Sequence, residues 1–277
     1  MVHSELRLNL TVVIPTRNRA EPVRRLVKEL NDLNCEIIVV DDYSERPLDV
    51  DGARIIRNTQ RLGSGESRNA GCKQAEHDWL LLLDDDLVPS PRLARFIDQL
   101  LPRLKTKDVV GFRIVGSNTI GSSIVNYWNT GISRMLNMLF GVDIFASSGP
   151  SRFIPSAMIF QSKFFASLGG FDSRRYGGNG FREESDLQWR ARKIGGRITY
   201  VEDPFFLHLN IPGGHNKRKS ENDVYYMRNQ TIFAVKTAPL ASLVMIASFG
   251  TYLLAKGMHV STLIKGVAQG LATVLQG

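Results

Sequence analysis

Polar and acidic side chains gather at three points in the first third of the chain, each directly after a short apolar run. The three clusters are Pro15-Thr16-Arg17-Asn18, Asp41-Asp42 and Asp84-Asp85-Asp86. Acidic residues after a single strand are equally well explained as turn formers. Two acidic clusters in a chain of net charge +8 are harder to explain that way, because adjacent carboxylates repel one another unless water or a cation stabilises them. Their oxygen atoms suit Mg²⁺ or Mn²⁺, which commonly takes one or two carboxylates together with substrate phosphates.

The elements that carry these clusters alternate between strands and helices. Short apolar runs predict five strands, at residues 10–14, 36–40, 54–56, 79–83 and 109–115. The segments between them predict helices at residues 21–30, 65–75 and 92–104. This order implies an α/β fold with a mostly parallel central sheet and flanking helices. Ligands of such sheets bind outside the carboxyl ends of the strands, where the three clusters fall.

The pattern changes after Gly116. An apolar segment at 124–140 predicts a core helix, with an acceptor-binding or membrane-facing surface as the alternative. The remaining pattern predicts a strand at 153–160, a helical turn at 162–168, a glycine-rich loop at 169–180, a helix at 184–194 and a last strand at 198–201.

A shift in composition near Asp223 predicts two units, a sheet-containing domain at 1–222 and an apolar helical tail at 223–277. No charge occurs between Thr237 and Ala255, a length that is borderline for a membrane span of about 20 residues. Pro239 and several small polar residues dilute its hydrophobicity. We therefore expect a helical hairpin that lies on the body or on a membrane surface, with a spanning helix as the alternative.

The composition excludes several protein classes. With 277 residues, 43% hydrophobic and 22% charged, the chain is neither collagen-like nor disordered. Two isolated cysteines, Cys35 and Cys72, favour a reducing compartment, and the first ten residues lack the apolar stretch of a secretory signal. The positive charge favours a polyanionic partner. However, the Lys and Arg residues are scattered without a nucleic-acid-binding motif, and residues 61–68 lack the third glycine of a dinucleotide-binding fingerprint.

Taken in order, the motifs resemble those of glycosyltransferase family 2, whose members bind nucleotide sugars on a GT-A fold. The resemblance covers about residues 8–210. The segments that carry it are Val13-Ile14-Pro15-Thr16-Arg17-Asn18-Arg19, Ile38-Val39-Val40-Asp41-Asp42-Tyr43-Ser44, Ser67-Arg68-Asn69-Ala70-Gly71, Leu82-Leu83-Asp84-Asp85-Asp86, Leu168-Gly169-Gly170-Phe171-Asp172, and Glu183-Glu184-Ser185-Asp186-Leu187 with Arg190 and His208.

The resemblance implies where a nucleotide-sugar donor binds. Thr16 and Asp42 match residues that contact the nucleotide base and ribose, with Asp42 accepting from a uracil-type N–H. Arg68 matches a nucleotide- or phosphate-contacting arginine. The implied donor-binding residues are Pro15, Thr16, Arg17, Asp42, Arg68, Asp84 and Asp85.

The resemblance also implies a Mg²⁺ or Mn²⁺ ion and a catalytic base. The aspartates at 84–86 match a DxD-type motif, and the candidate metal ligands are Asp86, Asp84 and His208. A structural histidine at a strand end is the alternative for the last of these. Glu184 stands where many relatives have an aspartate proposed as the base. Because Glu184 is one methylene longer, Glu183 and Asp186 are kept as alternatives.

Sugar transfer needs two kinds of assistance. Charge on the leaving diphosphate is stabilised by a cation, and Lys217, Arg218 or Lys219 could add to it. A carboxylate removes the proton of the acceptor hydroxyl. The basic segment 211–219 could close over the phosphates as a lid, or it could be a solvated loop.

We therefore expect a metal-dependent, inverting glycosyltransferase, with a lipid-linked or cell-envelope glycan as acceptor, in the cytoplasm at the cytosolic face of the cell membrane. A nucleotide-sugar-binding protein without catalytic activity is the alternative.

Overall fold

The computed structural model describes residues 7–116, 148–209, 211, 219–255 and 257–276. The helix predicted at 124–140 lies outside the described residues, and so do Lys217 and Arg218. Lys219 begins a helix, but its side chain is also outside the description.

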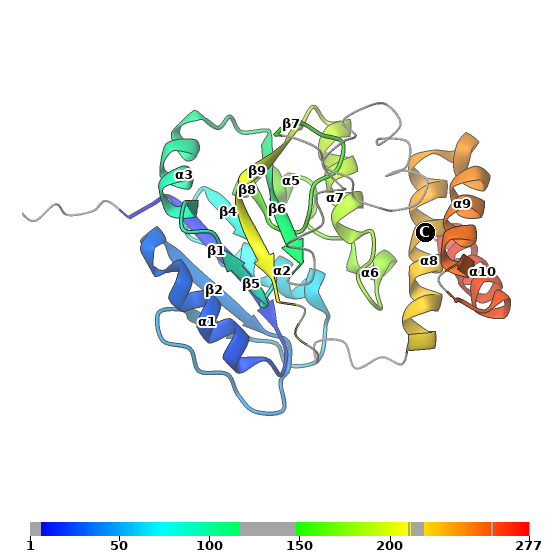
Figure 1. Cartoon of the computed structure of the whole chain (residues 1–277), viewed down its shortest axis with the longest axis horizontal. Helices are drawn as coiled ribbons and strands as arrows, with labels where there is room; N and C mark the ends of the chain where they lie inside the picture. Colours follow the sequence, from blue (N-terminus) through cyan, green and yellow to red (C-terminus); the bar gives the residue numbers. More distant parts are fainter. Residues whose placement is uncertain (1–6, 117–147, 210, 212–218, 256, 277) are drawn as a thin grey trace, which may run out of the picture.

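Half of the central sheet is parallel, as predicted. β1 (Leu10–Thr16) lies between β2 (Glu36–Asp41) and β4 (Trp79–Leu82), and β3 (Arg54–Arg57) pairs with β2 at the edge. All these pairings are parallel. β-Branched and leucine side chains fill both faces of β1, β2 and β4, which are buried on both sides, whereas the edge strand β3 is partly exposed. Their carboxyl ends therefore meet at one edge (Figure 1).

The other half of the sheet is mixed, which the prediction of a mostly parallel sheet missed. β8 (Met158–Gln161) runs antiparallel between β4 and β6 (Asp108–Gly116), and β6 pairs in parallel with β9 (Arg197–His208). β5 (Leu87–Pro89) and β7 (Gly149–Pro150) pair antiparallel with β9. β5 and β7 are too short to give a periodic signal in the sequence.

β9 continues seven residues beyond the predicted end at Val201. In the sequence, the segment Glu202-Asp203-Pro204 interrupts the apolar strand pattern. In the structure, β9 accommodates this segment through a shift in its register with β6. Phe112 pairs with Val201, and the next residue of β6 pairs with Phe205. The bulged strand then carries His208 to the position opposite Leu87.

Helices cover both faces of the sheet. α1 (Ala20–Leu30) and α3 (Leu93–Leu100) pack on one face through leucine, isoleucine and valine side chains. α2 (Ser64–Lys73), α5 (Ser162–Ser167) and α7 (Glu183–Lys193) pack on the other face. Short 3₁₀ turns, Asn31–Leu33 and Leu101–Arg103, end α1 and α3. The structure is thus a three-layer α/β arrangement.

Three helices follow the sheet; the first packs against the short α6 (Ser173–Tyr176), and the other two pack on the first, as Figure 1 shows. They are α8 (Lys219–Thr237), α9 (Ser242–Ala255) and α10 (Val260–Gln276), with a 3₁₀ turn at Pro239–Ala241. α9 and α10 occupy the predicted hairpin, but the expected boundary at residue 222 falls inside α8. Of the helices described, none is long and apolar enough to cross a membrane.

Candidate active site

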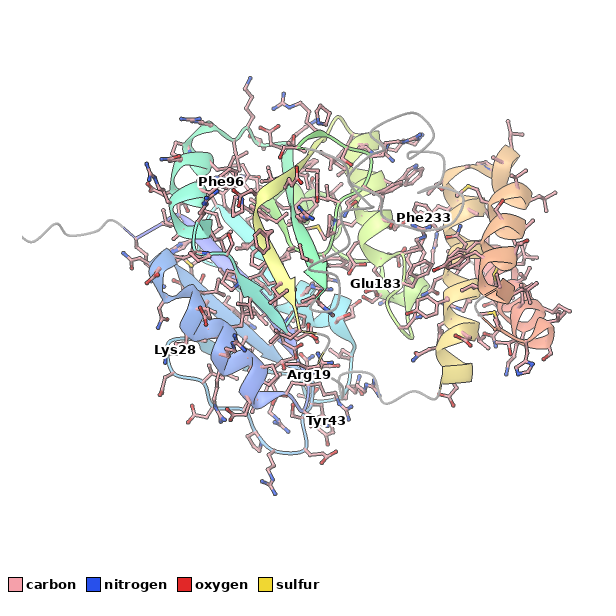
Figure 2. All side chains as sticks on the ribbon, viewed as in Figure 1. Arg19, Lys28, Tyr43, Phe96, Glu183 and Phe233 are labelled. Carbon is pink, nitrogen blue, oxygen red and sulfur yellow. The ribbon has the colours of Figure 1, made fainter. Side chains whose placement is uncertain are left out.

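A cavity of about 780 Å³ opens at the carboxyl ends of β1, β2 and β4. It collects side chains from these strand ends, from the start of α2 and from the start of α7. Figure 2 shows Arg19 and Glu183, which both line it. The predicted site residues in its wall are Pro15, Thr16, Arg17, Asp42, Arg68, Asp84, Asp85, Asp86, Glu183, Glu184 and His208.

Asp85 is tied to the protein through both oxygens. The Thr16 hydroxyl, at the end of β1, donates to Oδ2 at 2.6 Å, and Nη1 of Arg19 donates to Oδ1 at 2.8 Å. Burial raises the pKa of Asp85, and the contacts with Thr16 and Arg19 offset only part of this effect. Asp85 therefore fixes the positions of Thr16 and Arg19, and its predicted contact with a donor stays a prediction.

Asp86 lies beside an imidazole. Its Oδ1 is 3.3 Å from Nε2 of His208, and its Oδ2 is 3.2 Å from Nη1 of Arg19. Burial acts to raise the pKa of Asp86, but the contacts with His208 and Arg19 outweigh it, so the pKa is lowered. The side chain is therefore a carboxylate at neutral pH.

The neighbouring side chains of Asp86 and His208 offer one oxygen donor and one nitrogen donor at the cavity wall. In the described ranges no group of three or more His, Cys, Asp or Glu side chains could hold a metal ion. Mg²⁺ usually keeps one or two protein carboxylates and completes its coordination with water and substrate phosphates. The oxygen and nitrogen donors present fit such a cation when a diphosphate supplies the remaining ligands.

Asp84 pairs with an arginine. Arg68, on α2, is 2% exposed and forms an ion pair with Oδ1 of Asp84. The Ser156 hydroxyl donates to Oδ2 of Asp84 at 2.7 Å. Nη1 of Arg68 also lies 3.5 Å from Oε1 of Glu184. One buried guanidinium thus joins the end of β4 to the start of α7.

The two glutamates at the start of α7 have different environments. The side chain of Glu184 is 27% exposed, whereas Glu183 is 3% exposed. Burial, with the neighbouring charge of Glu184, raises the pKa of Glu183 to about 8. Glu183 therefore carries a proton at neutral pH, which leaves Glu184 the better placed of the two to accept one. A glycine at position 65 permits this packing, since a Cβ there would lie 2.6 Å from Oε2 of Glu183.

Asp42 already accepts three hydrogen bonds. Its Oδ1 accepts from Asn58 Nδ2 at 3.0 Å and from the Leu62 amide at 2.7 Å, and its Oδ2 accepts from the Gly63 amide at 2.9 Å. A carboxylate has about four acceptor positions. Asp42 therefore anchors the loop before α2, with one position left for the predicted N–H of a nucleotide base.

The structure does not bring Asp186 to the cavity. Asp186 is fully buried, accepts from Nε of Arg190 at 2.7 Å and pairs with Nζ of Lys236 at 2.6 Å. Arg190 and Lys236 balance the charge of this carboxylate inside the protein. These are the surroundings of a structural residue, in contrast to the alternative from the sequence that Asp186 is the catalytic base.

Sequence reasoning missed several residues of the cavity wall. Arg19 is the last residue of the motif at 13–19, two residues after Arg17. Its position in that motif is the feature of the sequence that could have indicated its place in the cavity wall. Arg61, Phe181 and Tyr226 also line the cavity. Tyr226 lies on α8, and nothing in the tail sequence indicates contact with the site.

The sequence matches a known family over more than half its length. The family model described as Glycosyl transferase family 2 matches residues 11–163. The pre-mycofactocin glycosyltransferase of Mycobacterium tuberculosis is 29% identical over 249 residues, which cover 84% of this chain and 47% of that protein. The chain thus spans about half the length of that curated relative.

Two solved structures share the arrangement of helices and strands. TarS 1–349 from S. aureus, crystallised in complex with UDP-GlcNAc, has a TM-score of 0.64 and 16% identity, covering 96% of this chain and 82% of that chain. GalNAc-T7, crystallised with UDP, GalNAc and Mn²⁺, has a TM-score of 0.56 and 16% identity, covering 86% of this chain and 52% of that chain. These likenesses confirm the predicted GT-A fold.

Proposed function

The chain belongs to glycosyltransferase family 2, and we propose that it is a metal-dependent, inverting glycosyltransferase that moves a sugar from a nucleotide-diphosphate donor to a hydroxyl acceptor. The observation that carries this proposal is the convergence, in one cavity, of the aspartates after β4 and the two glutamates that begin α7. A donor diphosphate and an acceptor hydroxyl need these groups on two sides of one site.

The donor side is formed by the strand ends and the start of α2. Arg17 lines the cavity, and its Nε and Nη1 are buried without a hydrogen-bond partner among the described residues. Such nitrogens can bind phosphate oxygens in a charge-assisted way. Asp42 keeps one acceptor position for a base N–H. UDP-GlcNAc in the TarS crystal structure makes UDP-sugars the first donors to test.

The charges in the cavity favour a bound cation. Six carboxyl groups line it, against four guanidinium groups from Arg17, Arg19, Arg61 and Arg68. Even with Glu183 protonated, an anionic diphosphate would enter a site without excess positive charge. A Mg²⁺ or Mn²⁺ ion held by Asp86 and His208 would supply the charge that stabilises the leaving diphosphate. The Mn²⁺ in the GalNAc-T7 crystal structure is a precedent within the same fold.

Glu184 is the proposed base. It takes the proton of the acceptor hydroxyl as the acceptor oxygen bonds to the anomeric carbon, and the bond from that carbon to the diphosphate breaks on the opposite face. Arg68 holds Glu184 beside the aspartate cluster. Single displacement of this kind inverts the anomeric configuration.

We propose a lipid-linked or cell-envelope glycan as acceptor, used in the cytoplasm at the cytosolic face of the membrane. The support is a set of exposed apolar side chains on the turn before α9 and on α9 and α10. They are Leu240, Leu243, Val244, Leu254, Val260, Ile264, Leu271 and Leu275. An apolar surface on a chain of net charge +8 suits an anionic membrane interface. The name of the relative from M. tuberculosis makes pre-mycofactocin the second acceptor to test.

Release of nucleoside diphosphate from UDP-, GDP- and dTDP-sugars, with and without Mn²⁺, tests the function. We expect one donor class to turn over with Mn²⁺ and an added acceptor, and to lose turnover with EDTA. Binding of a donor without turnover, over lipid-linked acceptors and pre-mycofactocin, would favour the catalytically inactive nucleotide-sugar-binding protein instead.

A further inference from the structure

The residue that precedes the two glutamates has an unusual backbone conformation. Arg182 has a φ of +74°, in the left-handed region, which residues other than glycine and asparagine visit rarely. Its side chain is buried rather than solvated. Such conformations persist where the surrounding structure holds them in place. The contacts of Arg182 therefore bear on where Glu183 and Glu184 point.

Helix α8 supplies those contacts. Nε of Arg182 donates to Oε1 of Gln230 at 2.8 Å, and the guanidinium carbon lies 5.0 Å from the ring centre of Phe233. Gln230 and Phe233 are three positions apart and so share one face of α8. Figure 2 places Phe233 on this helix, on the side facing α7. Gln230 is fully buried, so its Oε1 is shielded from water where it accepts from Arg182.

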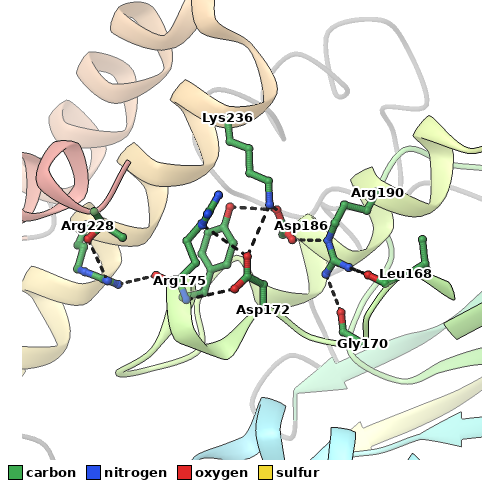
Figure 3. A network of polar contacts seen from close by, with 10 residues as sticks. Leu168, Gly170, Asp172, Arg175, Asp186, Arg190, Arg228 and Lys236 are labelled. Atoms are coloured by element: carbon green, nitrogen blue, oxygen red, sulfur yellow. Dashed lines mark hydrogen bonds and ion pairs between the residues drawn. The ribbon is translucent and has the colours of Figure 1, made fainter. Parts of the chain in front are cut away.

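Two more polar side chains of the same helix, those of Lys236 and Asn229, contact segments that adjoin the cavity wall. Nζ of Lys236 lies 2.6 Å from Oδ1 of Asp186, one turn into α7, and 3.8 Å from Asp172 (Figure 3). Nδ2 of Asn229 donates to the Tyr176 carbonyl at 3.1 Å, next to the glycine-rich part of the wall. α8 therefore contacts the chain both before and after the glutamates.

We infer that α8 is a positioning element for catalysis, and that Gln230 and Lys236 are positioning residues that fix Glu184 through Arg182 and Asp186. Neither Gln230 nor Lys236 lines the cavity, so both act through α7 rather than on the substrate. This inference rests on the proposed function for its catalytic consequence, but the structural link can be measured separately.

The decisive variant is Gln230→Leu, which keeps the size of the side chain and removes the acceptor for Arg182. We expect amide hydrogen exchange in residues 177–186 to rise by about tenfold or more, with the central sheet still protected. We expect kcat of donor turnover to fall by about tenfold or more, because a small displacement of a base is costly. The Kd for UDP with Mn²⁺ and the KM for the donor should stay unchanged.

Gln230→Glu and Thr237→Val are the matched controls. Gln230→Glu restores an oxygen acceptor for Arg182 and should recover most of kcat. Among the residues that the structure describes, the Thr237 hydroxyl bonds within α8, to the Phe233 carbonyl, so Thr237→Val should change neither exchange nor kcat. If Gln230→Leu does not fold, Lys236→Met takes its place with the same expected pattern.

Unchanged exchange at 177–186 in Gln230→Leu would overturn the inference. An increase in exchange over the whole chain, with UDP affinity falling in parallel with kcat, would also overturn it, because α8 would then contribute only stability. Failure of the wild-type protein to bind UDP or turn over any donor would count against the proposed function. The local exchange result would still decide whether α8 holds the start of α7 in place.

Discussion

Nη1 of Arg68 lies 3.5 Å from Oε1 of Glu184, although 116 positions separate the two residues in the chain. The same guanidinium pairs with Asp84 at the end of β4. A single buried side chain therefore sets the spacing between the aspartate cluster and the start of α7. In the proposed reaction that spacing separates the departing diphosphate from the base.

Replacing Glu184 by glutamine should remove the proton acceptor and keep the shape of the cavity. We expect the transfer rate to fall by about 10²–10⁴-fold, the usual cost of losing a general base. UDP affinity should be retained. Initial rates of nucleoside diphosphate release, together with calorimetric titration of UDP, would measure the two effects.

Glu183→Gln and Asp186→Asn are the comparison variants for that prediction. Glu183→Gln should keep most of the transfer rate, because Glu183 is already protonated at neutral pH. Asp186→Asn should lower stability, since it leaves Lys236 without its closest carboxylate. Near-normal transfer by Glu184→Gln would assign the base to Glu183.

The sequence could predict much of this site because its residues stand at strand ends. The β-branched and leucine runs locate β1, β2 and β4, and the polar residues after them identify one edge of a sheet. The start of α7 was predicted within one residue, at Glu184 instead of Glu183. Family resemblance then linked Glu183 and Glu184 to the same edge.

Other features depended on contacts that no local pattern contains. The charges of the three aspartates are balanced in part by Arg19 and Arg68, so their clustering alone did not require a cation. His208 reaches Asp86 only because β9 passes through its irregularity. The role of α8 rests on Gln230 and Lys236, which occur in a tail whose composition indicated a separate unit.

Asp86→Ala tests the proposed cation site. Mn²⁺ should strengthen UDP binding to the wild-type protein, and this gain should fall by about 10- to 100-fold or more in the variant. Calorimetric titration of UDP with Mn²⁺ and with EDTA measures the difference. Asp98→Ala, an exposed aspartate on α3, is the control and should behave as wild type. An unchanged Mn²⁺ effect in Asp86→Ala would place the cation elsewhere.

The raised pKa of Glu183 predicts how stability depends on pH. This carboxyl has a pKa of about 8 in the folded protein and about 4.3 in an unfolded chain. Between these two pKa values only the folded state keeps the proton. The contribution of Glu183 to the free energy of unfolding is therefore fully present below the unfolded-state pKa and is lost as pH rises through the folded-state pKa. The loss is at most about 1.4 kcal/mol per pH unit.

Glu183→Gln should remove that dependence, because glutamine is neutral at every pH. The variant should gain stability relative to wild type steadily between about pH 5 and pH 8. Chemical denaturation at a series of pH values would measure the free energy of unfolding. If the free energy of unfolding changed with pH in the same way for both proteins, Glu183 would not hold its proton in the folded state.

Leu240, on the turn before α9, and Leu243, on α9, are the apolar side chains to change first in a membrane-binding test, since both are largely exposed. Burying one leucine contributes about 1.5–3 kcal/mol, so Leu240→Ser with Leu243→Ser should weaken vesicle binding by about tenfold or more. Sedimentation with phosphatidylglycerol-containing vesicles measures this. Ile194 is an exposed apolar residue at the end of α7, so Ile194→Ser should leave vesicle binding unchanged. Equal binding by all variants would remove the membrane proposal.

Deleting α9 and α10 would be a poorer test of membrane binding, because both helices also support α8. The interface is close at Gly270, where a Cβ would lie 2.7 Å from Cβ of Thr231 and 2.8 Å from the Arg228 carbonyl. Gly270→Val should therefore push α10 away from α8 and cost about 1–3 kcal/mol, the usual penalty of overpacking. Ala268→Val, exposed on the same helix, is the control for placing a valine on α10, and helix propensity alone would favour Gly270→Val, because valine is a better helix former than glycine. Thermal unfolding should show a lower Tm for Gly270→Val than for Ala268→Val, and equal values would mean that α10 does not pack on α8 in solution.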